Sequence, residues 1–297
     1  MKKDLIEAAL HCWDISDPYI KDAYGKDSED IPRIICRIGT ETCDYVLKGI
    51  RNIPETTIIS NVQAYLFLGN RHALAPRLYP TKEGTFYIRK QEYFFYLMEY
   101  IDGRQMEENV SDEYKIGQLT RKLHSIENYE FISPLTQSKK RYYEWFAERA
   151  FKKEFDEILD SLPEFESLSQ SFVHTDIGPH NTMMKKNGDI VFIDLDDSGM
   201  GSRYLDLGWP FIMQFVDFNH ETEEMTYRFE LAKAFLDGYY CGEKISREEF
   251  DLLFQGAIQM HISYMQVYEP YAVDSLWKIL NFGIAQKETL WELLENK

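Results

Sequence analysis

The chain has 297 residues, which is long enough for one large domain or for two lobes that share a cleft. Hydrophobic residues make up 44% and charged residues 28%, an ordinary globular composition that excludes extensive disorder. The net charge of −17 disfavours a broad electrostatic grip on a nucleic-acid polymer or an anionic membrane, but is compatible with a cationic substrate.

The N-terminal segment MKKDLIEAALHCWDI contains acidic residues and no apolar core, so it predicts an amphipathic helix and not a signal peptide. No run of about 18 apolar residues occurs, so no membrane span is predicted. The cysteines have no CxxC spacing, which disfavours a zinc or thioredoxin-type site. We therefore expect free thiols and a cytoplasmic location.

The first hundred residues read mainly as strands. Three runs with β-type composition predict antiparallel strands joined by short turns: YIKDAY, IPRIICRI and CDYVLKGI. Residues 56–69 predict a helix with Ile59, Val62 and Leu66 near one face. TFYIRK and YFFYLMEYI then predict two more strands, with the polar Gln-Glu pair between them as the turn.

Beyond residue 100 the pattern becomes helical. Gly103 is expected to end the strand run. SDEYKIGQLTRKLHSI predicts a helix capped by Ser111, and further helices are predicted over 141–160, 222–240 and most of 247–296. One β-rich island, 171–197, lies among them. The sequence thus predicts an α+β fold of two lobes: a β-rich N-lobe with an antiparallel sheet, residues 1–100, and a mostly helical C-lobe, residues 101–297.

The island carries the polar residues of greatest interest. The loop TDIGPHN follows an apolar strand, and TMMKK and DIVFID form a hairpin around Asn187-Gly188, which returns Asp194 toward that loop. Phosphoryl transfer needs a carboxylate that orients the acceptor hydroxyl and takes its proton. It also needs hard oxygen ligands for Mg²⁺, which bridges the nucleotide phosphates. We assign the first role to Asp176 and the second to Asn181 and Asp194.

The same segment resembles a known family. HTDIGPHN is similar to the H-x-D-x-x-x-x-N catalytic loop of the aminoglycoside phosphotransferase and choline kinase superfamily, which has a protein-kinase-like fold. IDLD resembles its metal-binding segment, and the Asp206-Leu207 and LTRKLH elements also match in order and spacing. The resemblance implies ATP or GTP as co-substrate and a small hydroxyl acceptor of the aminoglycoside, choline or homoserine-like kind. It gives His174 and Asp206 bracing roles.

The N-terminal strands fit the same resemblance. In DYVLKGI, alternation puts Val46 and Lys48 on one face. The resemblance implies that Lys48 contacts the nucleotide α/β-phosphates, that Val46 covers the adenine, and that the backbone from Glu99 to Ile101 meets the adenine edge. The Y-V-L-K strand, a T-x-x-G hairpin and the E-x-I-x-G hinge resemble in particular the spore-coat kinase-like branch.

Two departures leave an alternative open. The loop from Gly25 to Asp30 has one glycine and three acidic residues, although phosphate cradling favours glycine and disfavours anions. Gln63 stands where a glutamate is expected to pair with Lys48. Either departure could reduce or abolish activity, so the alternative is a non-catalytic kinase-fold binding or scaffold protein.

A metallohydrolase is a further alternative. His174, Asp176, His180 and Asp194 supply metal-ligand types, but Pro179 disfavours a helix that would put both imidazoles on one face. The sequence does not indicate the oligomeric state.

The helical C-terminal third is expected to build the acceptor pocket. An aromatic and acidic wall there could hold an ammonium group by cation–π and ion-pair contacts, and helix packing is the alternative role of its members. The candidates are Trp209, His261, Tyr264, Tyr268 and Glu269.

Overall fold

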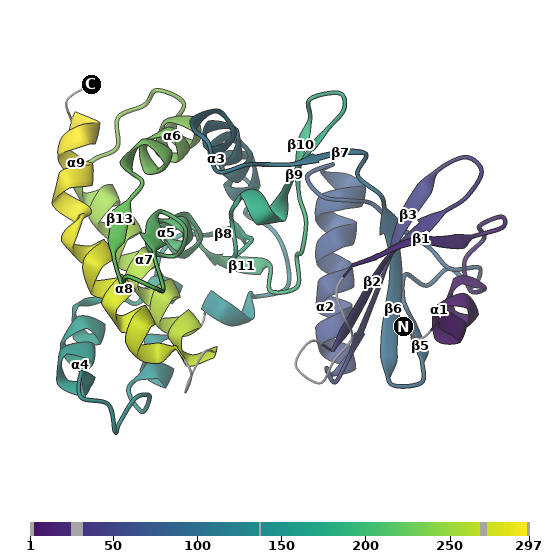
Figure 1. Cartoon of the computed structure of the whole chain (residues 1–297), viewed down its shortest axis with the longest axis horizontal. Helices are drawn as coiled ribbons and strands as arrows, with labels where there is room; N and C mark the ends of the chain where they lie inside the picture. Colours follow the sequence, from purple (N-terminus) through teal and green to yellow (C-terminus); the bar gives the residue numbers. More distant parts are fainter. Residues whose placement is uncertain (1–2, 25–31, 137, 268–271, 296–297) are drawn as a thin grey trace. The chain divides into compact units, whose positions relative to one another are not determined.

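The computed structural model describes residues 3–24, 32–136, 138–267 and 272–295. The chain forms two compact units (Figure 1). The first unit contains Met1–Arg104 and Met183–Asp196, and the second contains Gln105–Thr182 and Asp197–Lys297. The loop from Gly25 to Asp30 and the candidates Tyr268 and Glu269 lie outside the described residues.

The first unit is built on an antiparallel sheet whose strands follow the order β1-β2-β3-β6-β4, with β5 also paired to β6. A second, smaller set of strands joins β10, β9 and β7. The elements are α1 (Lys3–Leu10), β1 (Tyr19–Tyr24), β2 (Arg33–Gly39), β3 (Asp44–Arg51), α2 (Glu55–Tyr65), a π-helical turn (Leu66–Arg71), β4 (Leu78–Tyr79), β5 (Ile88–Lys90), β6 (Tyr93–Glu99), β7 (Gly103–Gln105), β9 (Thr182–Lys185) and β10 (Ile190–Phe192).

Alternation along the strands gives the sheet two faces of different character. On one face, apolar residues from β2, β3 and β6 pack with α1: Leu5, Ile6, Leu10, Ile34, Cys36, Leu47, Phe95 and Leu97. Because side chains alternate, Lys48 and its register partners Ile35 and Tyr96 belong to the opposite face. Figure 1 shows α2 on that side of the sheet and α1 on the other.

The observed units divide the chain differently from the predicted lobes at two places: residues 101–104 and 183–196 belong to the first unit. Residues 183–196 fall in the predicted C-lobe range, but the structure groups them with the first unit. The physical reason is the hairpin of β9 and β10, which turns at Gly188 with a φ of +90° and carries Asp194 to Lys48. The predicted turn at Asn187-Gly188 is therefore confirmed.

The second unit is mainly helical. Its elements are α3 (Val110–His124), α4 (Lys152–Ser161), β8 (Gln170–Val173), β11 (Gly199–Ser202), α5 (Arg203–Met213), β12 (Val216–Phe218), β13 (Met225–Tyr227), α6 (Phe229–Tyr240), α7 (Arg247–Val267), α8 (Val273–Ala285) and α9 (Lys287–Glu295). The pair β8–β11 is antiparallel and leads directly into the polar loop that begins at His174.

Helices α3 and α6 approach closely because each has a glycine at the crossing. A Cβ atom on Gly117 would lie 2.1 Å from the carbonyl oxygen of Phe235, and one on Gly238 would lie 1.9 Å from that of Tyr114. No real side chain tolerates such distances, so only glycine permits this crossing. The crossing places His124, the last residue of α3, beside Tyr239 of α6.

Several predicted boundaries are corrected by the structure. Asn109, not Ser111, caps α3, because its side chain accepts a hydrogen bond from the Asp112 amide at 3.0 Å. Gly103 begins strand β7 and does not end the strand run. Ile59 is exposed on α2, whereas Ile58 and Val62 are buried, because the buried stripe of the helix follows the i, i+4 positions 58 and 62.

Two predicted helices are shorter than expected. In 141–160 only α4 is α-helical, and Phe146 before it has a φ of +60°, which no α-helix accommodates. In 222–240 the helix begins at Phe229, because Met225–Tyr227 pairs with β12 as strand β13. None of the helices in the ranges that the structure describes combines the length and the apolar character needed to cross a membrane.

Candidate active site

In the first unit, Lys48 lies within β3 with its ammonium between two carboxylates. Its Nζ atom is 2.7 Å from Oδ1 of Asp194 and 2.8 Å from both oxygens of Asp196. The lysine is only 4% exposed, so its charge requires nearby partners. The structure thus brings Lys48 together with Asp194 and Asp196, a contact that the sequence analysis did not predict.

The electrostatics of this cluster favour the charged lysine. Burial alone would lower the pKa of Lys48, but the attraction of Asp196 and then Asp194 outweighs it and raises that pKa well above its ordinary value. Lys48 is therefore a fixed positive charge in the physiological range.

The backbone at Asp194 is held in an unusual conformation. Its φ is +58°, a left-handed value that aspartate tolerates better than most residues. The buried hydroxyl of Tyr65 accepts hydrogen bonds from the amides of Asp194 at 3.1 Å and Leu195 at 3.4 Å. The guanidinium of Arg33 lies 3.6 Å from the second carboxylate oxygen of Asp194. These contacts point the carboxylate toward Lys48 and Arg33.

Asn61 of α2 reaches the Asp196 carboxylate of this cluster. Its Nδ2 donates to Oδ1 of Asp196 at 3.3 Å, and the Tyr96 hydroxyl donates to the same oxygen at 3.4 Å. Asp196 supplies the acidic partner of Lys48 for which the sequence offers only Gln63 on the helix. Lys48 therefore has an anionic partner although Gln63 is uncharged.

In the second unit, the polar loop after β8 holds Asp176 and Asn181 in contact. Nδ2 of Asn181 donates to Oδ2 of Asp176 at 2.7 Å and to the Asp176 carbonyl at 3.0 Å. The imidazole Nε2 of His180 lies 3.0 Å from Oδ1 of Asp176. Each carboxylate oxygen of Asp176 therefore has one partner from its own loop.

These contacts keep Asp176 ionised. Burial alone would raise the pKa of Asp176, but the His180 hydrogen bond and charge, His174 and Asn181 together lower it below its ordinary value. The side chain is 45% exposed, so a substrate hydroxyl can reach it. An ionised, accessible carboxylate is the state required to accept a hydrogen bond from a hydroxyl.

Each unit separately offers oxygen atoms of the kind that a hard cation takes. Because both hydrogen bonds of Asn181 use Nδ2, its amide oxygen is not engaged by any hydrogen bond within the described ranges. In the first unit, Asp194 and Asp196 offer carboxylate oxygens. Amide and carboxylate oxygens are the ligands that Mg²⁺ takes beside nucleotide phosphates.

Asp206 stabilises the backbone of the loop by hydrogen bonds, as predicted. It is fully buried and accepts hydrogen bonds from the amides of His174 at 2.8 Å and Thr175 at 2.6 Å. Nε2 of His124 lies 3.0 Å from Oδ2 of Asp206, the oxygen that also accepts from the His174 amide. His174 is 1% exposed and accepts from the Asp176 amide at 3.3 Å, which confirms its bracing role.

The predicted adenine-contacting residues lie on β3 and at the end of β6. Val46 is half-buried and shares the face of Lys48. The Glu99 amide already donates to the Arg77 carbonyl at 2.8 Å, and its carboxylate pairs with Arg77 and Lys185. Ile101, beyond the strand, has no backbone hydrogen bond within the described ranges, so it is the better candidate for meeting a nucleobase edge.

The described members of the predicted acceptor wall are instead part of the helical core. Trp209 and Tyr264 meet edge-to-face at 5.1 Å inside an apolar cluster. His261 is fully buried, and burial lowers its pKa to about 4 despite a hydrogen bond to the Leu276 carbonyl. These three residues therefore pack the helices of the second unit.

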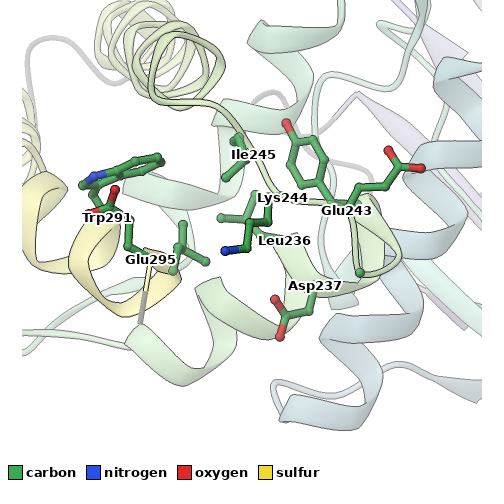
Figure 2. A pocket seen from close by; sticks show the side chains of 10 residues that line it. Leu236, Asp237, Glu243, Lys244, Ile245, Trp291 and Glu295 are labelled. Atoms are coloured by element: carbon green, nitrogen blue, oxygen red, sulfur yellow. The ribbon is translucent and has the colours of Figure 1, made fainter. Parts of the chain in front are cut away.

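A pocket of about 310 Å³ is present elsewhere in the second unit (Figure 2). Its walls come from α6, α9 and the segment between α6 and α7, and include Leu236, Tyr240, Lys244 and Trp291. None of the residues predicted to take part in phosphoryl transfer lines it. We therefore do not assign this pocket to the catalytic site.

The metallohydrolase alternative gains no support. Across the described ranges, no group of three or more His, Cys, Asp or Glu side chains is arranged to hold a metal ion. His174 is instead engaged with the Asp176 amide, and His180 with the Asp176 carboxylate.

Sequence reasoning missed Asn61 and Arg33, and it considered His180 only as a possible metal ligand. Asn61 and Arg33 are brought to Asp196 and Asp194 only by the packing of α2 and the sheet against the β9–β10 hairpin. The contact of His180 with Asp176 could have been predicted, because His180 follows Asp176 by four residues in a short loop, where the two side chains cannot lie far apart.

Comparison with solved structures places this fold among kinase-like phosphotransferases. The microcompartment-associated aminopropanol kinase matches with a TM-score of 0.66 and 14% identity over 99% of this chain and 98% of that chain. An aminoglycoside phosphotransferase from Alicyclobacillus acidocaldarius matches with a TM-score of 0.61 and 14% identity over 98% and 96%. An ethanolamine kinase from Plasmodium vivax matches with a TM-score of 0.57 and 14% identity over 98% and 83%.

The predicted protein-kinase-like α+β fold is thus confirmed. None of these three structures is named as a spore-coat protein, so that narrower resemblance stays a prediction. Residues 35–240 match the model of the phosphotransferase enzyme family, APH. Since this match spans more than half of the 297 residues, the chain belongs to the phosphotransferase enzyme family.

Proposed function

We propose that this protein transfers the γ-phosphoryl group of ATP or GTP to a hydroxyl group of a small molecule. The observation that carries the proposal is the state of Asp176, an ionised and accessible carboxylate whose two oxygens are oriented by His180 and Asn181. A residue with only a structural role has no need of that accessibility. The family match supports the reaction class.

In this proposal Asp176 orients the acceptor hydroxyl and receives its proton as the new bond to phosphorus forms. Asp206 keeps the loop rigid through the amides of His174 and Thr175. A base in a fixed position holds the attacking hydroxyl in the orientation needed to reach the γ-phosphorus. Such positioning is a main contribution of the protein to the rate of phosphoryl transfer.

Asn181 and Asp194 would hold Mg²⁺, with Asp196 as a further oxygen donor. The ion would supply positive charge that offsets the negative charge of the nucleotide phosphates. Lys48 would contact the α/β-phosphates. Its ammonium group lies beside Asp194 and Asp196, the two carboxylates that would hold the ion, and therefore beside the place proposed for the phosphates. The proposal includes the convergence of both units on one nucleotide.

The nucleobase would lie beside Val46, with the backbone of Ile101 meeting its edge and Glu99 supporting the end of β6. The acceptor is proposed to be an amine-bearing alcohol of the aminoglycoside, choline or homoserine-like kind. The overall charge of −17 supports a cationic acceptor. Kinases named for aminopropanol and ethanolamine have the same fold.

The first test is nucleotide binding, measured by thermal shift with ATP and GTP in the presence and absence of Mg²⁺. A ligand that binds only the folded state raises its stability by mass action. We expect one nucleotide to raise the melting temperature and Asp194→Ala to lose the magnesium-dependent part. Asp14→Ala, an exposed residue of the first unit, is the control. No shift with either nucleotide at millimolar concentration would refute the proposal.

The second test is turnover with a panel of amino alcohols and sugars. Asp176→Asn is expected to lower kcat by roughly 10²–10⁴-fold, because it removes the proton acceptor and keeps the shape. Asp217→Ala, at an exposed position, should leave kcat unchanged. Full activity of Asp176→Asn would contradict the assignment.

The scaffold alternative is left with one argument. Its case from Gln63 is removed by the Lys48–Asp196 pair, and only the acidic loop from Gly25 to Asp30 still favours it. Nucleotide binding without turnover on any acceptor would support that alternative.

A further inference from the structure

His180 is held in a defined position although it is not part of the core. Its side chain is 53% exposed, yet its Nε2 is 3.0 Å from Oδ1 of Asp176. An ionised carboxylate only accepts hydrogen bonds, so Nε2 must carry the hydrogen and donate it. The contact is therefore directional and acts on the base that we assign to the reaction.

The loop backbone sets the place of this ring. Residues Pro179–Asn181 form a 3₁₀ turn, and the Asn181 amide donates to the Gly178 carbonyl at 3.1 Å. A Cβ atom on Gly178 would lie 2.7 Å from Cε1 and 2.8 Å from Nδ1 of His180, so the ring packs directly on the glycine. Nε2 of Gln105 donates to the His180 carbonyl at 2.9 Å and fixes the backbone of the turn.

His180 and Asn181 hold opposite oxygens of the same carboxylate. The last torsion of an aspartate side chain is broad and nearly two-fold, so one hydrogen bond alone leaves the plane of the carboxylate free to tilt. Two donors on the two oxygens fix that plane. Each oxygen keeps a second lone pair, which leaves Asp176 able to accept a hydrogen bond from a substrate.

We propose that His180 is a positioning residue, whose Nε2–H donates to Oδ1 of Asp176 and fixes the carboxylate plane so that Asp176 can take the proton of the acceptor hydroxyl as that hydroxyl attacks the γ-phosphorus. This inference rests on the proposed phosphotransfer function. His180 does not touch the reacting atoms in this role. Its contribution is to the orientation of the base and not to nucleotide binding.

The consequence is a selective loss of turnover. His180→Ala removes the donor and should lower kcat about 10- to 100-fold, because small misplacement of a reacting group costs rates of this order. The KM for nucleotide should remain within about twofold, and the thermal shift with nucleotide and Mg²⁺ should be retained. His180→Gln keeps an N–H donor of similar reach and should recover most of the lost kcat.

The control is His220→Ala, which changes an exposed histidine of the same unit outside the catalytic loop and should leave kcat unaltered. A purely structural role for His180 would lower the melting temperature and affect both substitutions alike. Wild-type kcat in His180→Ala, or a Gln variant as impaired as the Ala variant with its fold intact, would overturn the proposal.

A crystallographic measurement separates this inference from the proposed function. Structures of both variants report the orientation of the Asp176 carboxylate without reference to any acceptor. The carboxylate should rotate or become disordered in His180→Ala and keep its orientation in His180→Gln. An unchanged Asp176 in His180→Ala would overturn the inference even in an active enzyme, whereas inactivity of the wild type would count only against the proposed function.

Discussion

Replacing Asp206 by alanine is expected to be among the most damaging substitutions in the second unit. The carboxylate is fully buried. Its Oδ2 accepts from the His174 amide and lies 3.0 Å from Nε2 of His124, and its Oδ1 accepts from the Thr175 amide. Without the carboxylate, two backbone donors and one imidazole are left unsatisfied in the interior. Thr175 has a φ of +74°, a strained value that these contacts maintain.

The magnitude follows from the number of groups left unpaired. A hydrogen bond to a charged group contributes about 1.5–3 kcal/mol, and such terms are not additive because the three donors share one acceptor. Breaking a buried pair by removing one partner costs about 3–5 kcal/mol. We therefore expect Asp206→Ala to lower the free energy of unfolding by about 3–5 kcal/mol. Asp206→Asn should lower the free energy of unfolding by less than Asp206→Ala does. The asparagine oxygen still accepts a hydrogen bond, although its amide nitrogen then faces another donor.

The assay is equilibrium unfolding in urea at neutral pH, with the slope of the transition compared between variants. Asp217→Ala, at an exposed position that pairs with Arg228 at 3.4 Å, is the control and should change stability by less than about 1 kcal/mol. A loss below about 1 kcal/mol for Asp206→Ala would show that the loop is held by other contacts.

Two further outcomes follow from buried groups of the second unit. Burial, with a smaller contribution from Glu108, raises the pKa of Glu113 from 4.5 to about 8, so the folded state retains a proton that the unfolded state releases. Stability should therefore fall as the pH rises from about 5 to 8, and Glu113→Gln should remove this fall, on the order of 4 kcal/mol at pH 8. Urea titrations at both pH values measure it, and an equal fall in the variant would contradict the reasoning. Gly238→Ala should lower stability by about 1–3 kcal/mol despite alanine's better helix propensity, since its Cβ would lie 1.9 Å from the Tyr114 carbonyl oxygen. A higher melting temperature in a thermal scan would show that the two helices are not in such close contact.

Local sequence signals determined much of this protein. Period-two alternation located β3 and put Val46 and Lys48 on one face, and the Asn187-Gly188 turn determined a hairpin that carries Asp194. The spacing of Asp176 and Asn181 within one short loop was sufficient to bring them into contact. Such features depend on the backbone of a few neighbouring residues, which is why they can be read from the chain alone.

Other features were decided only by tertiary structure. The partner of Lys48 is Asp196, 148 residues away, and Asn61 reaches it because of how α2 packs on the sheet. The core places of Trp209, His261 and Tyr264 depend on the packing of helices α5, α7 and α8. A helical pattern indicates which face of a helix is apolar, but not which element covers that face. Helix propensity depends on neighbouring residues, whereas burial depends on segments that are distant in the sequence.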